Sequence, residues 1–527
     1  MTSLTNPAPS ETFPLAVIGG GIAGLAAAYE VFRIASTETG EAASVGTEIA
    51  GSAGTGNAAR VEAGSAASAE AAGQAGKHAP GPLEAAPLAA RPSIVLFEAD
   101  DRLGGKITTL RRDGFVVEGG PDTFLATKPW AVELCRELGI EDRLRGTNPH
   151  RKATYVLHRG RLEPLPDGLT MMIPTRFAPM LRTRLLTWPE KARMGLDFFL
   201  PPRRTEDDES LGAFITRRLG RGAYEGLIEP LLSGIYAGDG DRLSMPATFP
   251  YLRDLEQQYG GLIKGALAMR RKMGKRAPGT RSAFLTPETG LAEIVEALEA
   301  YLRAHGAALW TRTPVTALTP TAEGFRITTP QGQFFARAVV LATPAYITAD
   351  LVAPFAPEAA AALRGIPYTT TATVSLAYRE SDLPRPLDGY GYVIPRREGR
   401  EALACTWTST KFPHRAPEGY ALLRVFVGRD GQEDAIPWTE DALVAIARRE
   451  LAQTLGITAA PLFAEVFVWP QAMPQYTLGH LERVAAAEKA LAPWPNLALA
   501  GNAYRGIGIP DCIRSGREAV RKLGLKA

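Results

Sequence analysis

The sequence has few of the residues that hold small secreted proteins together. Only three cysteines, Cys135, Cys405 and Cys512, occur among 527 residues, and no two of them form a CxxC pair. This pattern argues against a disulfide framework and against a structural zinc site. The six histidines show no HExxH-like spacing, so we expect no metal centre.

Long hydrophobic runs are also missing. No stretch of about 18 uncharged apolar residues is present, which excludes an evident membrane-spanning helix. The opening segment "MTSLTNPAPSETFP" has neither a basic region nor an apolar core, so it does not read as a secretory signal. The net charge of +3 is too small to indicate nucleic-acid binding. We expect a cytoplasmic protein, with peripheral membrane contact left open.

A glycine-rich loop stands near the start of the sequence. "PLAVIGGGIAGLAAAYEVFRIA" reads as an apolar strand, the motif Gly19-x-Gly21-x-x-Gly24 and an alanine-rich helix. Between a strand and a helix this motif is typical of dinucleotide binding, because each glycine has a separate steric role. A diphosphate would lie at the helix N-terminus, where free N–H groups and the helix dipole favour anions. The alternative is a glycine turn that only joins the two elements.

The acidic residue expected about 20 residues after such a loop is not found there. Residues 36–92 instead contain Ala, Gly, Ser, Glu and Pro, without Phe, Tyr or Trp. Such a composition predicts a disordered insertion. The next strand, in "SIVLFEADDRLGGKI", ends at Glu98. We therefore expect Glu98 to bind the adenosine ribose, although a surface carboxylate without a role is the alternative.

Three further loops favour a flavin over a nicotinamide. "RLGGK" and "VVEGGPDTF" are additional glycine loops after Glu98, and "LALAGNAYRGIGIPDCIRSG" forms another near the end of the sequence. A long cofactor such as FAD uses several loops along its length. Gly501 ends a short strand, and the helix that follows can direct its N-terminus at the flavin. Both ends of the sequence are thus expected to contact one cofactor.

At this point the sequence resembles a known family, the FAD-dependent porphyrinogen oxidases within the amine oxidase-like flavoproteins. The specific segments are "EGGPDTFL", "LIEPLLSGIYAGDGDRLSM", "ACTWTSTKFPHRAPEG", "MPQYTLGH" and "GIGIPDCIRSG". They are most similar to the soluble bacterial branch that acts on coproporphyrinogen III. Together with Gly501, the resemblance implies these FAD contacts: Gly19, Gly20, Gly21, Ile22, Ala23, Gly24, Glu98, Ala99, Lys106, Gly120, Pro121, Asp122, Thr123, Val315, Trp469, Ile507, Gly508 and Ile509.

The expected fold class is α/β. We predict an FAD-binding Rossmann-like lobe, an interleaved α+β substrate domain and a helical lobe. The FAD-binding domain is expected to be discontinuous, over residues 14–35, 93–127, 282–345 and 465–527. The other expected parts are a disordered N-terminus (1–13), the insertion (36–92), the substrate domain (128–145, 235–281 and 346–464) and the helical lobe (146–234).

The resemblance implies that the flavin removes three hydrides in succession and that O2 reoxidises it to give hydrogen peroxide. This agrees with the absence of any Ser-His-Asp, Cys-His or paired-carboxylate spacing. Lys128 follows an FAD loop and is the favoured cation for a substrate propionate, and Tyr392 is a weaker candidate for lining the macrocycle. Both residues have plain structural alternatives, a solvent lysine and a packing tyrosine.

The other enzyme considered is protoporphyrinogen IX oxidase, which has the same chemistry. A more distant alternative is a flavin-binding interaction protein that contacts a partner of the haem pathway. Residues 174–204 mix apolar and basic side chains, and they could contact anionic lipid. A solvated helix face is an equally good interpretation of this segment.

Overall fold

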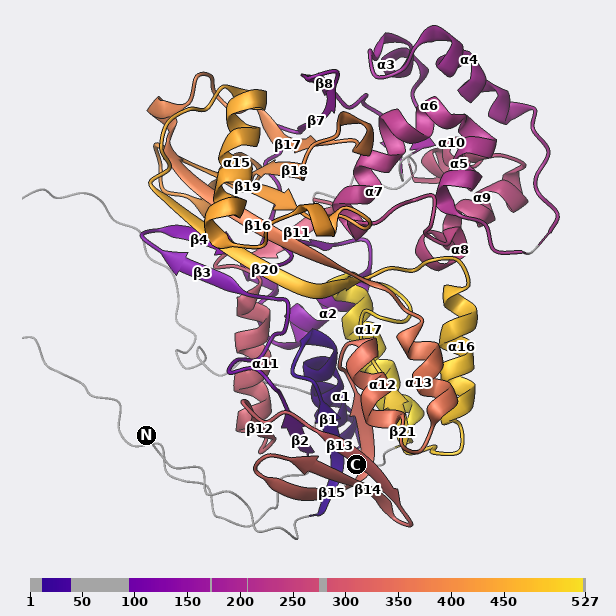
Figure 1. Cartoon of the computed structure of the whole chain (residues 1–527), viewed down its shortest axis with the longest axis vertical. Coiled ribbons are helices and arrows are strands. Elements are labelled where there is room, and N and C mark those ends of the chain that lie inside the picture. The colour runs from indigo at the N-terminus through magenta and orange to yellow at the C-terminus, as the bar shows by residue number, and fades with distance from the viewer. Residues whose placement is uncertain (1–11, 39–93, 171–172, 206, 274–281, 525–527) are drawn as a thin grey trace, which may run out of the picture.

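The computed structural model describes residues 12–38, 94–170, 173–205, 207–273 and 282–524 (Figure 1). The predicted disorder of 1–13 and 36–92 lies almost wholly outside these residues. Where the two overlap, the first strand already begins at Thr12 and the first helix continues to Glu38. Thr12 and Phe13 pair with a neighbouring strand, and the buried Phe13 ring packs against Trp310. The ordered structure is therefore slightly longer than predicted at both places.

The first sheet contains seven strands around a parallel centre. The strand order is β12-β2-β1-β15-β14-β13, and β21 pairs with β15. Strands β12, β2, β1, β15 and β21 run parallel, whereas β14 and β13 are antiparallel. The strands are β1 (Thr12–Ile18), β2 (Ile94–Phe97), β12 (Ala308–Trp310), β13 (Ala317–Thr321), β14 (Gly324–Thr329), β15 (Gly332–Leu341) and β21 (Leu497–Leu499).

Helices cover both faces of the parallel part of this sheet, as the nearly continuous apolar strands predict. Leu15 and Val17 of β1 face one layer, while Ala16 and Ile18 face the other. The first layer holds α1 (Ile22–Glu38), α2 (Pro129–Glu137), α11 (Ala292–Ala304) and α17 (Ile509–Lys522). The second holds α12 (Ala345–Val352), α13 (Pro357–Arg364) and α16 (His480–Leu491).

The second sheet also has seven strands, in the order β20-β16-β19-β18-β17-β7-β8, and only β17 and β7 are parallel. Helix α15 (Glu440–Leu455) packs on one face of it. The strands are β7 (Ala153–His158), β8 (Arg161–Pro164), β16 (Tyr368–Arg379), β17 (Gly389–Val393), β18 (Ala402–Trp407), β19 (Tyr420–Val427) and β20 (Phe463–Pro474).

Short elements connect the two sheets. They are the hairpin β3 (Thr109–Arg112) and β4 (Phe115–Glu118), the small sheet of β5 (Phe124–Leu125), β11 (Phe284–Pro287) and β6 (Leu144–Gly146), and α14 (Thr408–Lys411).

The helical region lies beside the second sheet (Figure 1). Its elements are the strand pair β9 (Leu169–Thr170) and β10 (Ile173–Pro174) and the helices α3 (Phe177–Arg182), α4 (Trp188–Gly195), α5 (Leu211–Leu219), α6 (Arg221–Ala223), α7 (Glu229–Tyr236), α8 (Met245–Thr248), α9 (Pro250–Tyr259) and α10 (Leu262–Met273). Within the described residues, no helix combines the length and apolar character needed to cross a membrane.

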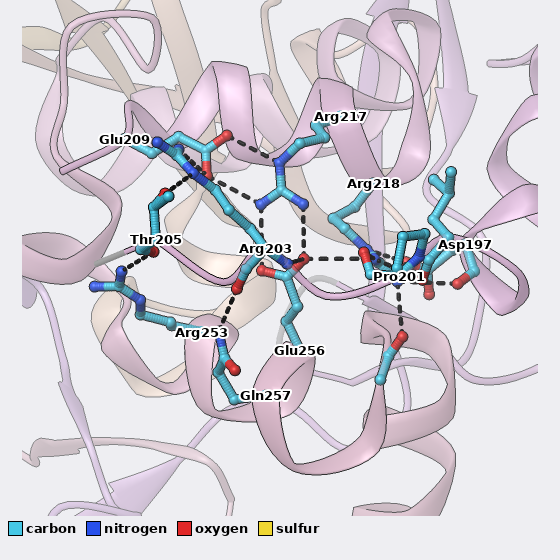
Figure 2. Close-up of polar contacts among 12 residues, drawn as sticks. Asp197, Pro201, Arg203, Thr205, Glu209, Arg217, Arg218, Arg253, Glu256 and Gln257 are labelled. Carbon is cyan, nitrogen blue, oxygen red and sulfur yellow. Dashed lines mark hydrogen bonds and ion pairs between the residues drawn. The ribbon is translucent and has the colours of Figure 1, made fainter. Parts of the chain in front are cut away.

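An ion-pair network joins the helices of this region (Figure 2). The Arg218 guanidinium is fully buried and lies 2.6 Å from a carboxylate oxygen of Asp197, which is buried as well. Arg217 bridges Glu209 and Glu256 from the adjacent position on α5. Because a buried guanidinium without a carboxylate partner is very costly, these pairs fix how α5, α9 and the segment after α4 lie against one another.

The observed packing differs from the predicted division of the chain at four places. Strands β7 and β8, expected in the helical lobe, extend the second sheet, and so does β20, expected in the FAD domain. Helices α12 and α13, expected in the substrate domain, cover the first sheet instead. Residues 245–273 pack into the helical region. In each case the partner surface is remote in sequence, so the local pattern did not reveal it.

Candidate functional site

The glycine loop leaves β1 at the carboxyl edge of the first sheet. Gly19 has a φ of +106°, and a Cβ there would lie 2.8 Å from the Ala342 carbonyl oxygen. A Cβ on Gly24 would lie 1.9 Å from the Gly19 carbonyl oxygen. A Cβ on Gly21 would meet no protein atom within 4 Å, so a ligand can reach the backbone there. This arrangement suits a diphosphate at the start of α1.

Glu98 lies directly beside this loop at the end of β2. Its Oε2 atom accepts a hydrogen bond of 2.5 Å from the Gly20 N–H, and its Oε1 atom accepts one of 2.9 Å from the Asp100 N–H. The second glycine loop joins the same site, because the Gly104 N–H donates to the Gly20 carbonyl oxygen at 2.8 Å. The carboxylate thus braces the loop as well as facing the predicted ribose position. The sequence did not predict this second role.

The third glycine loop is held by side chains of the second sheet. The Gly119 carbonyl accepts hydrogen bonds from the Thr373 hydroxyl at 2.9 Å and from Trp469 Nε1 at 2.8 Å. The Gly120 carbonyl accepts one from the buried Arg424 guanidinium. Strands β16, β19 and β20 therefore hold the same two peptide groups. This loop connects the two sheets at the predicted cofactor site.

Asp122, in the same loop, forms an ion pair with Lys411. The carboxylate and ammonium groups are 2.9 Å apart, and the Thr123 hydroxyl donates to the other carboxylate oxygen. Burial alone would raise the pKa of Asp122, but the positive charges of Lys411 and Arg424 lower it to about 2. Asp122 is therefore ionised at neutral pH and keeps Lys411 at the loop.

A buried pair next to this loop was missed by sequence reasoning. The Glu118 carboxylate lies 2.9 Å from the Arg415 guanidinium and accepts hydrogen bonds from the Thr109 hydroxyl and the Leu291 N–H. Its burial raises the pKa of Glu118 despite the nearby arginine. The sequence signal was the acid directly before "GGPDTF", but its partner lies almost 300 positions away and could not be identified.

The C-terminal loop runs from Gly501 to Gly508, between β21 and α17. Gly501 has a φ of +123°, and its N–H donates to the Ser515 hydroxyl at 3.1 Å. A Cβ on Gly516 of α17 would lie 2.0 Å from the Ala23 carbonyl oxygen, so α17 packs backbone to backbone on α1. The first and last predicted cofactor loops therefore start adjacent helices at one edge of the first sheet.

The remaining predicted FAD contacts have different surroundings. Ile22 and Ala23 are buried in the first turn of α1, and Ile509 packs in the same core. Val315 packs against the other face of the first sheet, and Ile507 packs beside Tyr236 and Tyr476. The half-buried Gly508 and Pro121 lie within the C-terminal and third glycine loops, and the exposed Ala99 and Lys106 follow Glu98.

Of the two predicted substrate residues, Lys128 lies next to this site. Its Nζ atom is 2.5 Å from Oδ2 of Asp511, in the first turn of α17, and the lysine side chain is 41% exposed. It is therefore not a free solvent lysine.

The expectation for Tyr392 is corrected by the structure. Its ring is 2% exposed and packs in the core beneath α15, and its hydroxyl is 3.2 Å from the Glu450 carboxylate. This face of β17 belongs to the core of the second sheet, so Tyr392 has a packing role.

The arrangement fits FAD. Glycine peptides and the α1 N-terminus suit the diphosphate, Glu98 suits ribose hydroxyls, and two more loops extend the site toward the second sheet. Bringing together four loops from distant parts of the chain is what a long, extended cofactor requires. Lys128 and Lys411 lie near the same loops, and each is paired with a carboxylate.

Comparison with known proteins gives the same result. Residues 84–523 match the family described as "Flavin containing amine oxidoreductase". Coproporphyrinogen III oxidase of Bacillus subtilis (strain 168) is 37% identical over 81% of this chain and 90% of that protein. The chloroplastic protoporphyrinogen oxidase of Nicotiana tabacum is 30% identical over 82% of this chain and 81% of that protein. A crystal structure from Exiguobacterium sp. 255-15 covers 98% of this chain and 99% of its own, at a TM-score of 0.77 and 32% identity.

Proposed function

Because the chain belongs to the flavin-containing amine oxidoreductases and is thus an FAD-dependent oxidoreductase, we propose that it oxidises coproporphyrinogen III to coproporphyrin III in haem biosynthesis. Each of three steps removes two electrons and two protons from the macrocycle, and O2 receives them to give hydrogen peroxide. The observation that carries the proposal is the 37% identity to a coproporphyrinogen III oxidase over nine-tenths of that protein.

When bound, FAD would supply the acceptor for the one hydride that leaves a methylene bridge in each of the three steps. The tasks left to the protein are binding, orientation and exclusion of water. Gly19 to Gly24 would hold the diphosphate, and Glu98 the ribose. The loop at Gly119 and Gly120, fixed from three strands of the second sheet, would lie between the cofactor and the substrate.

The cations near this loop would hold the substrate carboxylates. Lys128 is 41% exposed, and its ammonium keeps donors available beside Asp511 because it carries three. Lys411 is less accessible and already pairs with Asp122. We infer that Lys128 binds a propionate and that Lys411 does not contact the substrate directly but adds to the positive charge nearby. Two of the three protons leave from pyrrole N–H groups and the third from the remaining methylene bridge, and we assign no side chain as their base.

The second candidate is protoporphyrinogen IX oxidation, favoured by the 30% identity to the tobacco enzyme. A flavin-binding interaction protein is the third. Aerobic turnover of both porphyrinogens, followed by porphyrin fluorescence and by peroxide formation, separates them. We expect faster turnover of coproporphyrinogen III at low substrate concentration. A preference for protoporphyrinogen IX would show that this compound, and not coproporphyrinogen III, is the substrate. A yellow protein that is inactive on both porphyrinogens would favour the third candidate.

The helical region also carries a surface that suits an anionic membrane. Five large apolar side chains between 177 and 199 are exposed, among them Trp188 at 67% and Phe199 at 84%. Exposed arginines at 176, 182 and 184 lie among them. Apolar side chains with basic neighbours favour binding at a lipid interface. We propose peripheral contact of this surface with anionic lipid, which is compatible with the predicted cytoplasmic location.

Co-sedimentation with vesicles tests this contact. The chain should bind vesicles that contain phosphatidylglycerol and not vesicles of phosphatidylcholine alone. The variant F199S/W188S should lose binding, whereas Leu462→Ser, which changes an exposed leucine directly before β20, should retain it. If both variants bind the phosphatidylglycerol vesicles equally well, this surface does not make the lipid contact.

A further inference from the structure

Two aromatic side chains are stacked beside the C-terminal loop. The rings of Tyr476 and His480 have centroids 3.9 Å apart and planes inclined by only 14°. Both side chains are fully buried, and the Tyr236 ring lies 6.0 Å from the Tyr476 ring. The stack is therefore part of a packed aromatic cluster, in which neither ring can change its orientation without displacing its neighbours.

The Tyr476 hydroxyl and the His480 Nε2 atom both contact the backbone of one loop. The Tyr476 hydroxyl donates to the Asn502 carbonyl at 2.6 Å and accepts a hydrogen bond of 2.8 Å from the Gly506 N–H. The His480 Nε2 atom lies 2.9 Å from the Tyr504 carbonyl oxygen. Two side chains thus hold the backbone at every second residue of the loop, at positions 502, 504 and 506. Because a carbonyl oxygen can only accept, Nε2 is the donor of the hydrogen bond to Tyr504, and Nδ1 has no partner among the described residues.

The stack itself is attached to the other parts of the molecule. It follows β20 of the second sheet and stands at the start of α16. The Tyr476 carbonyl accepts a hydrogen bond of 2.7 Å from the Ser244 N–H, and Asp208 accepts one from the Gly479 N–H. The stack therefore connects the second sheet and the helical region to the C-terminal loop.

The loop between Gly501 and Gly508 needs such support. Gly501 and Gly506 both have a φ of +123°, a conformation with little intrinsic preference of its own. Directly after the loop comes α17, which packs at Gly516 against Ala23 in the first turn of α1. A shift of the loop would therefore change the surroundings of the cofactor at the carboxyl edge of the first sheet.

We propose that Tyr476 and His480 are positioning residues that hold the loop 501–508 against the flavin. The proposal rests on the assignment of this loop to the FAD site. It assigns the pair no contact with substrate. Loss of its hydrogen bonds should weaken FAD binding and alter the flavin spectrum, with a smaller effect on the KM for substrate.

Dilution of the holoenzyme tests the proposal, because released FAD is detected by its fluorescence. Tyr476→Phe keeps the ring and removes the hydroxyl, so we expect the FAD dissociation constant to rise about tenfold. His480→Ala should have a similar effect, and His480→Gln, which keeps an N–H donor, should restore part of the affinity. The absorption bands of the flavin should shift in the same order.

Tyr378→Phe is the matched control, because Tyr378 is equally buried in the core of the second sheet. It should leave FAD release unchanged. A Gly506→Ala variant tests the loop independently, since a Cβ there would lie 2.6 Å from the Asp511 side chain. Weaker FAD binding in Gly506→Ala with normal binding in Tyr476→Phe and His480→Ala would overturn the role of the pair. Normal binding in all of these variants would overturn the loop assignment as well. None of these results depends on which porphyrinogen is oxidised.

Discussion

Lys128 Nζ lies 2.5 Å from Oδ2 of Asp511, although 383 positions separate the two residues in the sequence. Asp511 is 6% exposed and stands in the first turn of α17. A carboxylate at this position is also favoured by the helix dipole. The pair therefore connects the end of the third glycine loop with the C-terminal helix, at the edge where the cofactor loops meet.

The first prediction concerns substrate affinity. Lys128→Ala should raise the KM for coproporphyrinogen III at least tenfold, because a hydrogen bond to a charged group contributes about 1.5–3 kcal/mol. The kcat should change little, since a contact made equally in the ground and transition states affects KM. FAD content should stay intact. Steady-state kinetics on both porphyrinogens and the flavin absorbance of the purified variant check these outcomes.

Asp511→Asn separates binding from positioning. This variant removes the charged partner of Lys128 and leaves its ammonium available, so the KM should not rise. If both variants raise the KM equally, Lys128 acts by fixing α17 and is not a ligand of the substrate.

A second prediction concerns the buried ion pairs of Figure 2. Arg218→Met would leave Asp197 and Glu256 buried without their common partner. Breaking a buried pair from one side typically costs about 3–5 kcal/mol, so the melting temperature should fall by several degrees. The KM should remain unchanged in the protein that stays folded. Arg221→Met is the control, because its pairs with Glu225 and Asp241 are exposed and should contribute less than about 1 kcal/mol.

Local patterns predicted the parts of the site that depend on local geometry. The glycines at 19, 21 and 24 could be assigned from their spacing between a strand and a helix, and Glu98 from the strand that precedes it. These features are encoded within about 20 residues, and the structure places the glycine loop between β1 and α1 and Glu98 directly after β2.

Contacts between remote segments were beyond such reasoning. Nothing near Glu118 in the sequence indicates Arg415, and nothing near Asn502 indicates Tyr476. Tyr392 was the weaker candidate for the site, with packing as the alternative, because a tyrosine on a strand can face either side of a sheet. Only the packing of α15 decides which side is the core. The residues that support the cofactor loops come from such pairs.

The contact between α1 and α17 leads to a third prediction. Gly516→Ala would place a Cβ about 2 Å from the Ala23 carbonyl oxygen, so the helices must separate. We expect weaker FAD binding and a lower melting temperature, both measured on the purified variant. Gly234→Ala on α7 is a matched control, since a Cβ there meets nothing within 4 Å and alanine favours helix. Its melting temperature should be unchanged or higher.

The final prediction concerns stability at mildly acidic pH. Burial, together with the charges of Arg483 and Arg505, lowers the pKa of His480 to about 4, although the Tyr504 carbonyl opposes this shift. The unfolded chain, with an ordinary histidine pKa of about 6.5, therefore binds more protons than the folded chain between these values. The free energy of unfolding must fall as the pH decreases from about 6.5 toward 4. Burial gives the half-buried His414 a pKa of about 4 as well, so it contributes in the same direction.

Melting temperatures of wild type and His480→Gln at pH 7.5 and 5.5 check this sign. Glutamine does not titrate, so the variant should lose less stability on acidification than the wild type, although His414 still contributes. The range lies above the ordinary pKa values of Asp and Glu, which limits the contribution of most carboxylates. If the melting temperature falls equally in both proteins, His480 binds no more protons in the unfolded chain than in the folded chain over this range. The imidazole would then take up a proton in the folded protein as readily as in the unfolded chain, contrary to the lowered pKa of the buried His480.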